Sequence, residues 1–311
     1  MSVRELVILG SGAGQAQPDR YLHAALLRWD DEGILMDPAE GTQRRMIHAD
    51  VTATSLSRIF ISHFHADRCL GLAGLSQRIS LDRVPHAVEV WFPAEGRVFF
   101  DRLRKASVYH AAAKLRPVPL EAEGTVEASS RLHLSVAALR HRVPVFGMRL
   151  EEPEGRTMLP DALAQAGVHG PAIKRLQREG ILEVDGRTVR LDDVSAPKPG
   201  HAVAYVPDTR PCAGVERLLA SADLALVHAP FSAEQRTRAE RAGELTAAEA
   251  GAMAEAAGVR SLVLTGFRPD SEASDILVRE ARRTFAGSVT AAEDGVRLPI
   301  VRKGKHGAVP T

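Results

Sequence analysis

The chain has 311 residues, of which 45% are hydrophobic, so it can bury a substantial core, and its 40 basic and 39 acidic residues nearly cancel. This balance excludes a protein that binds nucleic acid through overall positive charge, so any contact with RNA must come from a local basic patch. Two cysteines exclude a disulfide-rich scaffold, and no apolar run approaches the ~20 residues that span a bilayer. The first residues lead directly into a predicted strand, so we expect no signal peptide and a cytoplasmic location.

Strands and helices alternate along the N-terminal half. Short apolar runs bounded by glycine or polar residues predict buried strands, and apolar residues at helical spacing predict helices. In chain order we predict a strand at 6–9, a hairpin of strands at 22–29 and 33–37, a helix from residue 40, a strand at 59–62, a helix at 70–79, a strand at 87–92 and a helix at 95–113.

The C-terminal half repeats this alternation after an interruption. Residues 151–200 are rich in glycine, proline and charge, and we expect an excursion from the core there, with a short basic helix near 173–178. A capping box at Thr246–Glu249 opens a further helix. The chain therefore predicts an α/β layered fold in a single domain, residues 1–311. The strands of this half are predicted at 132–139, 202–206, 224–227 and 261–265.

Candidate metal ligands follow the predicted strand ends. His63, His65 and Asp67 come directly after a buried strand, and their spacing lets several side chains converge on one divalent ion. His141 and Asp208 follow the ends of two later strands. Neutral imidazoles and a carboxylate suit zinc, which lowers the pKa of a bound water and polarises a phosphate or carbonyl group. The alternative for any single histidine is a structural role, since the chain has 12 of them.

Longer stretches carry a specific resemblance. In their order and spacing they resemble ribonuclease Z, the tRNA 3′-end endonuclease family of the metallo-β-lactamase superfamily, and the match spreads over nearly the whole length. The stretches are Asp37-Pro38-Ala39-Glu40-Gly41-Thr42-Gln43-Arg44, Ser62-His63-Phe64-His65-Ala66-Asp67, Gly71-Leu72, His141 ahead of Phe146-Gly147-Met148-Arg149, Asp208-Thr209-Arg210-Pro211-Cys212, and Ala257-Gly258-Val259 leading to Leu262-Val263-Leu264-Thr265.

The resemblance implies a four-layer αββα sandwich with a protruding arm, usually in a homodimer. It implies zinc-dependent hydrolysis of a phosphodiester at the 3′ end of precursor tRNA, with two zinc ions bridged by Asp208 and a water. Asp67 would face the second zinc and act as the catalytic proton acceptor. The ligands of the first zinc, by the same resemblance, would be His63, His65, His141 and Asp208.

The sequence departs from the family pattern at the second zinc. Arg68 stands where the family has a histidine after the aspartate, and Gly266 replaces the histidine of a late Thr-His-Phe motif. Glu244 replaces a further active-site histidine. Because a guanidinium is always protonated and glycine has no side chain, we expect one zinc ion. Two ions would require unrecognised ligands, for which the candidates are His23, His201 and His228.

One hypothesis is that Arg68 turns into the site, pairs with Asp67 and replaces part of the missing positive charge. At an effective dielectric constant of ~20, such a pair at ~4 Å attracts by roughly 4 kcal/mol before desolvation is counted. The alternative is that Arg68 points to solvent. Glu244 can donate a proton in such a site only if burial raises its pKa.

The excursion carries a candidate RNA-binding arm. Gly170 and Pro171 resemble the tip of the family's flexible arm, which grips tRNA away from the cleavage site. Lys174, Arg175 and Arg178 fall on one short helix and can pair with phosphates. A solvated helix face is the alternative.

The sequence leaves open whether the protein is an enzyme. The first interpretation is a zinc-dependent, ribonuclease Z-like endonuclease that acts on precursor tRNA. The second is a non-catalytic relative that keeps the fold, one metal and an arm that binds precursor tRNA or other RNA. The third is a one-zinc hydrolase that acts on another substrate. Zinc stoichiometry and a cleavage assay on precursor tRNA separate the three.

Overall fold

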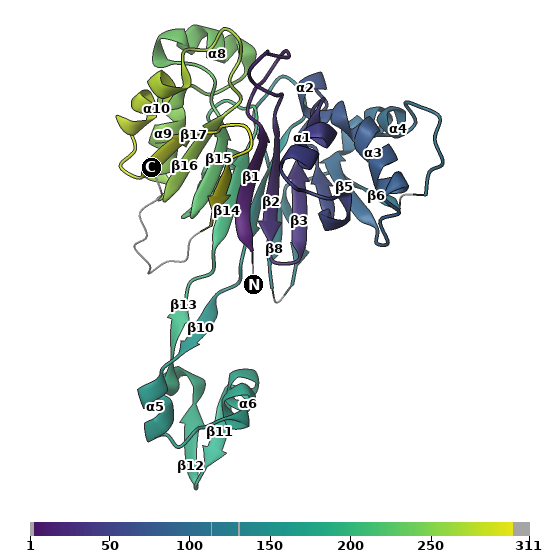
Figure 1. The fold of residues 1–311 in the computed structure, drawn as a ribbon. Coiled ribbons are helices and arrows are strands. Elements are labelled where there is room, and N and C mark those ends of the chain that lie inside the picture. The colour runs from purple at the N-terminus through teal and green to yellow at the C-terminus, as the bar shows by residue number, and fades with distance from the viewer. Residues whose placement is uncertain (1–2, 113, 130, 301–311) are drawn as a thin grey trace.

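The computed structural model describes residues 3–112, 114–129 and 131–300. Two seven-stranded sheets lie at the centre of the body, with helices on the outer side of each, as Figure 1 shows. The predicted four-layer αββα sandwich is therefore confirmed.

The first sheet contains the N-terminal strands and one strand from the end of the chain. Its order is β18-β1-β2-β3-β4-β5-β6, and the strands from β3 to β6 run parallel. The bounds are β1 Arg4–Gly10, β2 Ala24–Trp29, β3 Glu32–Met36, β4 Arg58–Phe60, β5 Val88–Pro93, β6 Leu115–Leu120 and β18 Arg297–Pro299.

The second sheet has the order β17-β16-β15-β14-β9-β8-β7. The strands from β14 to β17 run parallel, while β7, β8, β9 and β14 pair antiparallel. The bounds are β7 Gly124–Ala128, β8 His133–Ala138, β9 Phe146–Glu151, β14 Ala202–Val206, β15 Leu224–His228, β16 Ser261–Thr265 and β17 Ser288–Ala291.

Alternation along the strands divides the core into two layers. Leu6 and Ile8 of β1 belong to the apolar cluster that both sheets share, whereas Val7 and Leu9 belong to the cluster under the helices of the first sheet. Because both faces of the central strands are buried, these strands are continuous apolar runs in the sequence.

Helices cover both sheets, and the predicted capping box is confirmed. Thr246 Oγ1 accepts a hydrogen bond from the Glu249 backbone N–H, and the Glu249 carboxylate accepts one from the Thr246 backbone N–H. The helices of the first sheet are α1 Thr42–His48, α3 Gly71–Leu81 and α4 Arg97–Arg104. Those of the second are α7 Ala213–Leu219, α9 Ala247–Ala256 and α10 Ser274–Arg282, while α2 Ala66–Cys69 and α8 Arg236–Ala242 lie in connecting segments. Short 3₁₀ turns occur at Ala53–Ser55, Ala94–Gly96, Leu191–Val194 and Ala233–Gln235.

Two features between residues 95 and 120 differ from the prediction. The helix expected at 95–113 ends at Arg104, because Val108 beyond it is fully exposed and no apolar face continues to pack on the sheet; residue 113 lies outside the described residues. Strand β6 was not predicted because it contains Pro117 and Pro119, which lack an N–H. The two prolines are tolerated because β6 lies at the edge of the sheet.

The arm is built from the middle of the chain. Strands β10 Gly155–Met158 and β13 Ser195–Lys198 form its stalk. Figure 1 shows that it leaves the body at the end of the sheets opposite α2. Its tip contains α5 Pro160–Gln165, α6 Pro171–Glu179, β11 Ile181–Val184 and β12 Arg187–Arg190. The tip has its own small apolar core, made by Leu163, Val168, Leu176, Leu182, Val189 and Val194.

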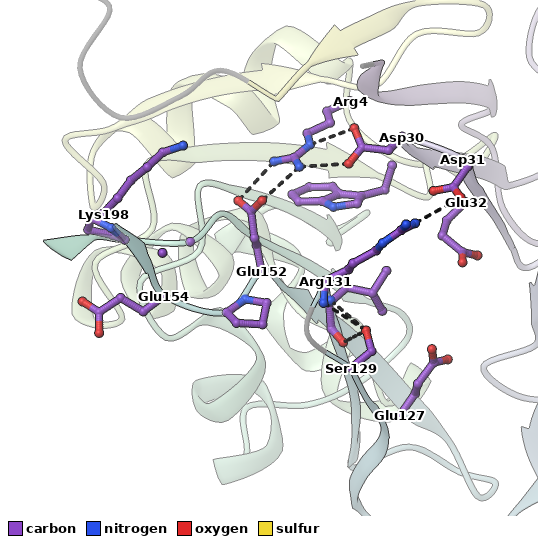
Figure 2. A pocket seen from close by; sticks show the side chains of 16 residues that line it. Arg4, Asp30, Asp31, Glu32, Glu127, Ser129, Arg131, Glu152, Glu154 and Lys198 are labelled. Carbon is purple, nitrogen blue, oxygen red and sulfur yellow. Dashed lines mark hydrogen bonds and ion pairs between the residues drawn. The ribbon is translucent and has the colours of Figure 1, made fainter. Parts of the chain in front are cut away.

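A cavity of about 460 Å³ lies where the stalk joins the body. Figure 2 shows Arg4 at its edge, where the guanidinium donates to both Asp30 and Glu152 and thereby ties β1 to the root of the arm. The same guanidinium lies 4.5 Å from the centre of the Trp29 ring. Because most of the charged side chains that line this cavity are acidic, it repels the phosphate groups of RNA.

Among the residues that the structure describes, no helix is both long and apolar enough to cross a membrane.

Candidate metal centre

The candidate ligands gather beyond the carboxyl ends of strands from both sheets. His63 and His65 follow β4, and Asp208 follows β14. His228 is the last residue of β15, and Gly266 directly follows β16. Because the strands around them run parallel, their carboxyl ends meet at one edge of the sandwich, where ligand sites of open α/β sheets form.

Three histidines form the first ligand group, with their donor nitrogens within 4.8 Å of one another. His63 Nε2 lies 3.0 Å from His65 Nδ1 and 3.3 Å from Asp208 Oδ2. The centre of the His141 ring lies 5.2 Å from that of each of the other two. The structure therefore brings together His63, His65, His141 and Asp208 from segments far apart in the sequence.

Hydrogen bonds orient two of these imidazoles. His141 Nδ1 lies 2.9 Å from the carbonyl oxygen of Gly243, and His63 Nδ1 lies 3.0 Å from Ser62 Oγ. Ser62 in turn donates through both its N–H and its hydroxyl to Asp37. Such partners determine which ring nitrogen stays free for a metal. Gly243 has φ +76°, and a Cβ there would lie 2.9 Å from His141 Nδ1, so glycine is needed for this contact.

The free nitrogen of His141 fits a metal ligand. His141 Nε2 is buried and has no hydrogen-bond partner among the described residues. Burial, the positive charge of Arg68 and the other two imidazoles lower the pKa of His63 to about 3, although Asp208 opposes this. Burial also lowers the pKa of His65. His63 and His65 are therefore neutral at pH 7, which is the form that binds zinc.

Asp208, His228 and Glu244 form a second group, and the guanidinium of Arg68 lies within it. Arg68 Nε and Nη2 donate to the two carboxylate oxygens of Asp208 at 3.0 and 2.9 Å. Nη2 also lies 2.7 Å from His228 Nε2. Arg68 is completely buried, and its pKa is raised because the attraction of Asp208 and Asp67 exceeds the effect of burial. The second group therefore already holds one positive charge and doesn't fit a metal ion while Arg68 remains there.

Gly266 makes room for this arrangement. A Cβ at this position would lie 1.5 Å from His228 Nε2, the atom that Arg68 contacts. The imidazole of His228 therefore occupies the space that a side chain at 266 would need, and Gly266 also has φ +81°, which favours glycine. The positions 68, 228 and 266 form one packed unit.

Glu244 is buried and its pKa is raised, as a proton donor in this site requires. It is 1% exposed, and burial together with the negative charge of Asp208 raises its pKa to about 7, against the effect of Arg268. Arg268 Nη2 donates to one carboxylate oxygen, while Oε2 has no hydrogen-bond partner within the described part of the chain.

The structure corrects the partner expected for Arg68. The guanidinium turns into the site as one hypothesis stated, but its ion pair is with Asp208 rather than Asp67. The Asp67 carboxylate accepts a hydrogen bond from the backbone N–H of Gly14 at 2.7 Å and belongs to neither ligand group among the described residues. Although burial favours its neutral form, the charge of Arg68 and the Gly14 N–H lower the pKa of Asp67.

The three further histidines proposed as ligands have different surroundings. His228 joins the second group, whereas His201 Nδ1 lies 3.0 Å from Asp223 Oδ2 and belongs to neither ligand group among the described residues. His23 Nε2 lies 3.0 Å from the Tyr205 hydroxyl, which donates to Asp37. No functional role was predicted for Asp37, Ser62 or Tyr205, although Asp37 and Ser62 lie in stretches that resemble the ribonuclease Z family.

The arm residues lie far from this centre along the fold. Gly170 has φ +52° and precedes Pro171, the first residue of α6. Arg175 and Arg178 are exposed and both donate to the carboxylate of Glu179. Lys174 is exposed on the same helix.

Relatives with closely similar sequences share one name. "Ribonuclease Z" of Nocardia farcinica is 46% identical over 301 residues, which cover 96% of this chain and 99% of that protein. "Ribonuclease Z" of Streptomyces coelicolor is 44% identical over 304 residues, which cover 97% of this chain and 100% of that protein. A family model described as "Anti-Pycsar protein Apyc1" matches residues 4–95.

Solved structures agree with the fold. The metallo-β-lactamase fold protein YhfI from Bacillus subtilis has a TM-score of 0.70 at 18% identity and covers 96% of this chain and 99% of its own. The short form of human tRNase Z has a TM-score of 0.69 at 22% identity, with 96% and 99% covered. From the identity and coverage of its sequence relatives, the chain belongs to the ribonuclease Z family.

Proposed function

We propose that the protein is an endonuclease that hydrolyses a phosphodiester at the 3′ end of precursor tRNA, using a single zinc ion. The names of the relatives and the human tRNase Z neighbour support the substrate. The ion would be held by His63, His65, His141 and Asp208. The observation that carries the metal is the buried Nε2 of His141, which has no hydrogen-bond partner among the described residues and lies beside the neutral imidazoles of His63 and His65.

The protein's own groups divide the remaining tasks. Zinc in this centre supplies Lewis acidity and an activated water. Arg68, buried beside Asp208, places a permanent positive charge where negative charge increases during attack on a phosphodiester. Asp67 is proposed as the proton acceptor, because its lowered pKa keeps it ionised at neutral pH and it is partly accessible.

Metal counting and cleavage test this proposal together. We expect about one zinc per chain by elemental mass spectrometry of the purified protein, and cleavage of a precursor tRNA that carries a 3′ trailer. The control is the same transcript without the trailer. Two zinc ions per chain would contradict the assignment of Arg68, and absence of cleavage with one zinc bound would contradict the endonuclease.

A second candidate function follows from the second ligand group. Because Arg68 occupies it, the chain lacks the symmetric two-metal clamp that stabilises both the attacking and the leaving oxygen. A relative that binds RNA without cutting it is therefore the alternative. It predicts retention of precursor tRNA with a steep salt dependence and no product.

The arm is proposed to bind tRNA through α6. We expect Arg175→Ala to weaken binding of precursor tRNA and to reduce the slope of log affinity against log salt by ~0.9, because each phosphate contact releases about one counterion. The matched control is Arg279→Ala, since Arg279 is equally exposed and forms the same i,i+4 ion pair on α10 of the body. An equal effect of both variants, measured by filter binding at several salt concentrations, would contradict a specific arm contact.

We also propose a homodimer in the cytoplasm, on the family resemblance alone. Light scattering of the purified chain tests the first statement.

A further inference from the structure

An apolar cavity of about 280 Å³ opens directly beside the candidate metal centre. His65 lines it and also belongs to the group of three histidines. Phe64 and Phe99 also line it, as do Val143 and Pro144, which follow His141 closely in the sequence. Any group held in this cavity therefore lies next to the ligands of the proposed zinc.

The shape of the cavity depends on packing that the sequence provides locally. The centres of the Phe64 and Phe99 rings are 5.6 Å apart, and the planes are tilted by 33°. A Cβ at Gly96 would lie 2.0 Å from the Phe64 ring, so glycine is required for this ring position. Within α4, Phe100 is completely buried, whereas its neighbour Phe99 is 46% exposed. Together with Phe64, the exposed ring of Phe99 gives this cavity beside His65 an aromatic lining, which is typical of small-molecule pockets.

We propose that this cavity receives a nucleobase adjacent to the scissile phosphate, stacked against Phe99. The inference rests on the proposed function, because it assigns a place to one part of the RNA substrate. The volume of the cavity lies just below the range of about 300–1,000 Å³ found for pockets of drug-sized ligands, so the cavity suits a single ring system. Base–aromatic stacking is a general mode of single-stranded RNA binding.

Charges around the cavity assign the base and the phosphate to different places. Glu95 lines the cavity, and its carboxylate repels a phosphate but accepts hydrogen bonds from the amino groups of bases. Arg142, whose positive charge acts on His65, favours a phosphate near the metal centre instead. The base thus enters the apolar cavity while its phosphate stays with the histidines.

Substitution of Phe99 tests the stacking. We expect Phe99→Ala to lower kcat/KM for precursor tRNA roughly ten-fold and Phe99→Tyr to retain it, because stacking requires the ring. Val98→Ala is the matched control, since Val98 is 47% exposed on the same helix but does not line this cavity. Two abasic transcripts, each lacking one of the bases that flank the cleavage site, identify the stacked base. When the base that enters the cavity is absent, Phe99→Ala should no longer lower kcat/KM, whereas absence of the other base should leave the effect unchanged.

Two outcomes overturn the inference while leaving the endonuclease intact: an unchanged kcat/KM in Phe99→Ala, or an equal loss on intact and both abasic transcripts. If the wild-type protein cuts no precursor tRNA, the proposed function fails instead. Stacking is then decided by the fluorescence of 2-aminopurine placed at each flanking position. Quenching on binding that Phe99→Ala abolishes supports the cavity as a base site, and absence of quenching at both positions overturns it.

Discussion

Replacing His141 by alanine is expected to abolish the bound zinc and to lower the cleavage rate of precursor tRNA roughly 1,000-fold or more. His141 supplies the one donor nitrogen of the first group that is buried without a partner among the described residues. Its loss leaves two imidazoles and Asp208, an incomplete set for a tetrahedral ion. A metal contributes several kcal/mol to stabilising charge in the transition state, and ~1.4 kcal/mol corresponds to ten-fold in rate. Elemental analysis and single-turnover cleavage measure the two effects.

Two further variants make the His141 experiment specific. His133→Ala removes an exposed histidine from β8, in the same part of the chain, and is expected to change neither zinc content nor rate. Gly243→Ala crowds Nδ1 of His141 without removing the ligand and is expected to weaken zinc affinity about 10- to 100-fold. Full zinc content in His141→Ala, with a normal rate, would mean that the metal lies elsewhere.

Replacing Arg68 by methionine is expected to lower the free energy of unfolding of the zinc-free protein by about 3–5 kcal/mol. The side chain is completely buried, and its two hydrogen bonds to Asp208 are the main compensation for that buried carboxylate. Methionine fills a similar volume but leaves Asp208 without its cation. His228 offsets part of the loss, because burial and then the charge of Arg68 lower the pKa of His228 to about 4, and removal of that charge favours protonation. Urea denaturation in the presence of a chelator measures the difference.

Two further variants distinguish the loss of the Arg68–Asp208 ion pair from the general effect of replacing an arginine by methionine. Arg78→Met removes a partly exposed arginine of α3 that pairs with Asp82 just beyond the helix, and we expect the free energy of unfolding to change by no more than about 0.5 kcal/mol. The double variant Arg68→Met/Asp208→Asn should recover most of the stability, because neither charge is then buried alone. In the single variant, the freed group of Asp208, His228 and Glu244 should raise the zinc count above one per chain. An unchanged stability of Arg68→Met would show that the guanidinium does not balance Asp208.

The sequence predicted the elements whose signal is local. The run before His63 is apolar and short, so the strand and the ligands at its end follow from the sequence pattern. The helix at α9 follows from its capping box. Strand β6 was missed because its two prolines are acceptable only at an edge, and whether a strand lies at an edge is a property of the whole sheet.

The partner of Arg68 depends on long-range packing. Arg68 and Asp208 are 140 residues apart in the sequence, whereas Asp67 directly precedes Arg68 and was therefore the expected partner. Adjacent residues at a helix start point in different directions, so Asp67 faces Gly14 while Arg68 enters the centre. Similarly, Asp37 directly follows β3 of the first sheet and Tyr205 lies in β14 of the second, and only the folded sandwich brings the Tyr205 hydroxyl within 2.6 Å of the Asp37 carboxylate.

The overlap between the His228 imidazole and the space above Gly266 ties together residues that different stretches of the gene encode. Arg68 contacts that ring through Nη2, and the ring leaves room only for glycine at 266. Arginine at position 68 and glycine at position 266 should therefore occur together among homologues, and homologues that change only one of them should be rare. Covariation of positions 68 and 266 across many genomes would indicate that selection maintains a site whose positive charge comes from an arginine side chain.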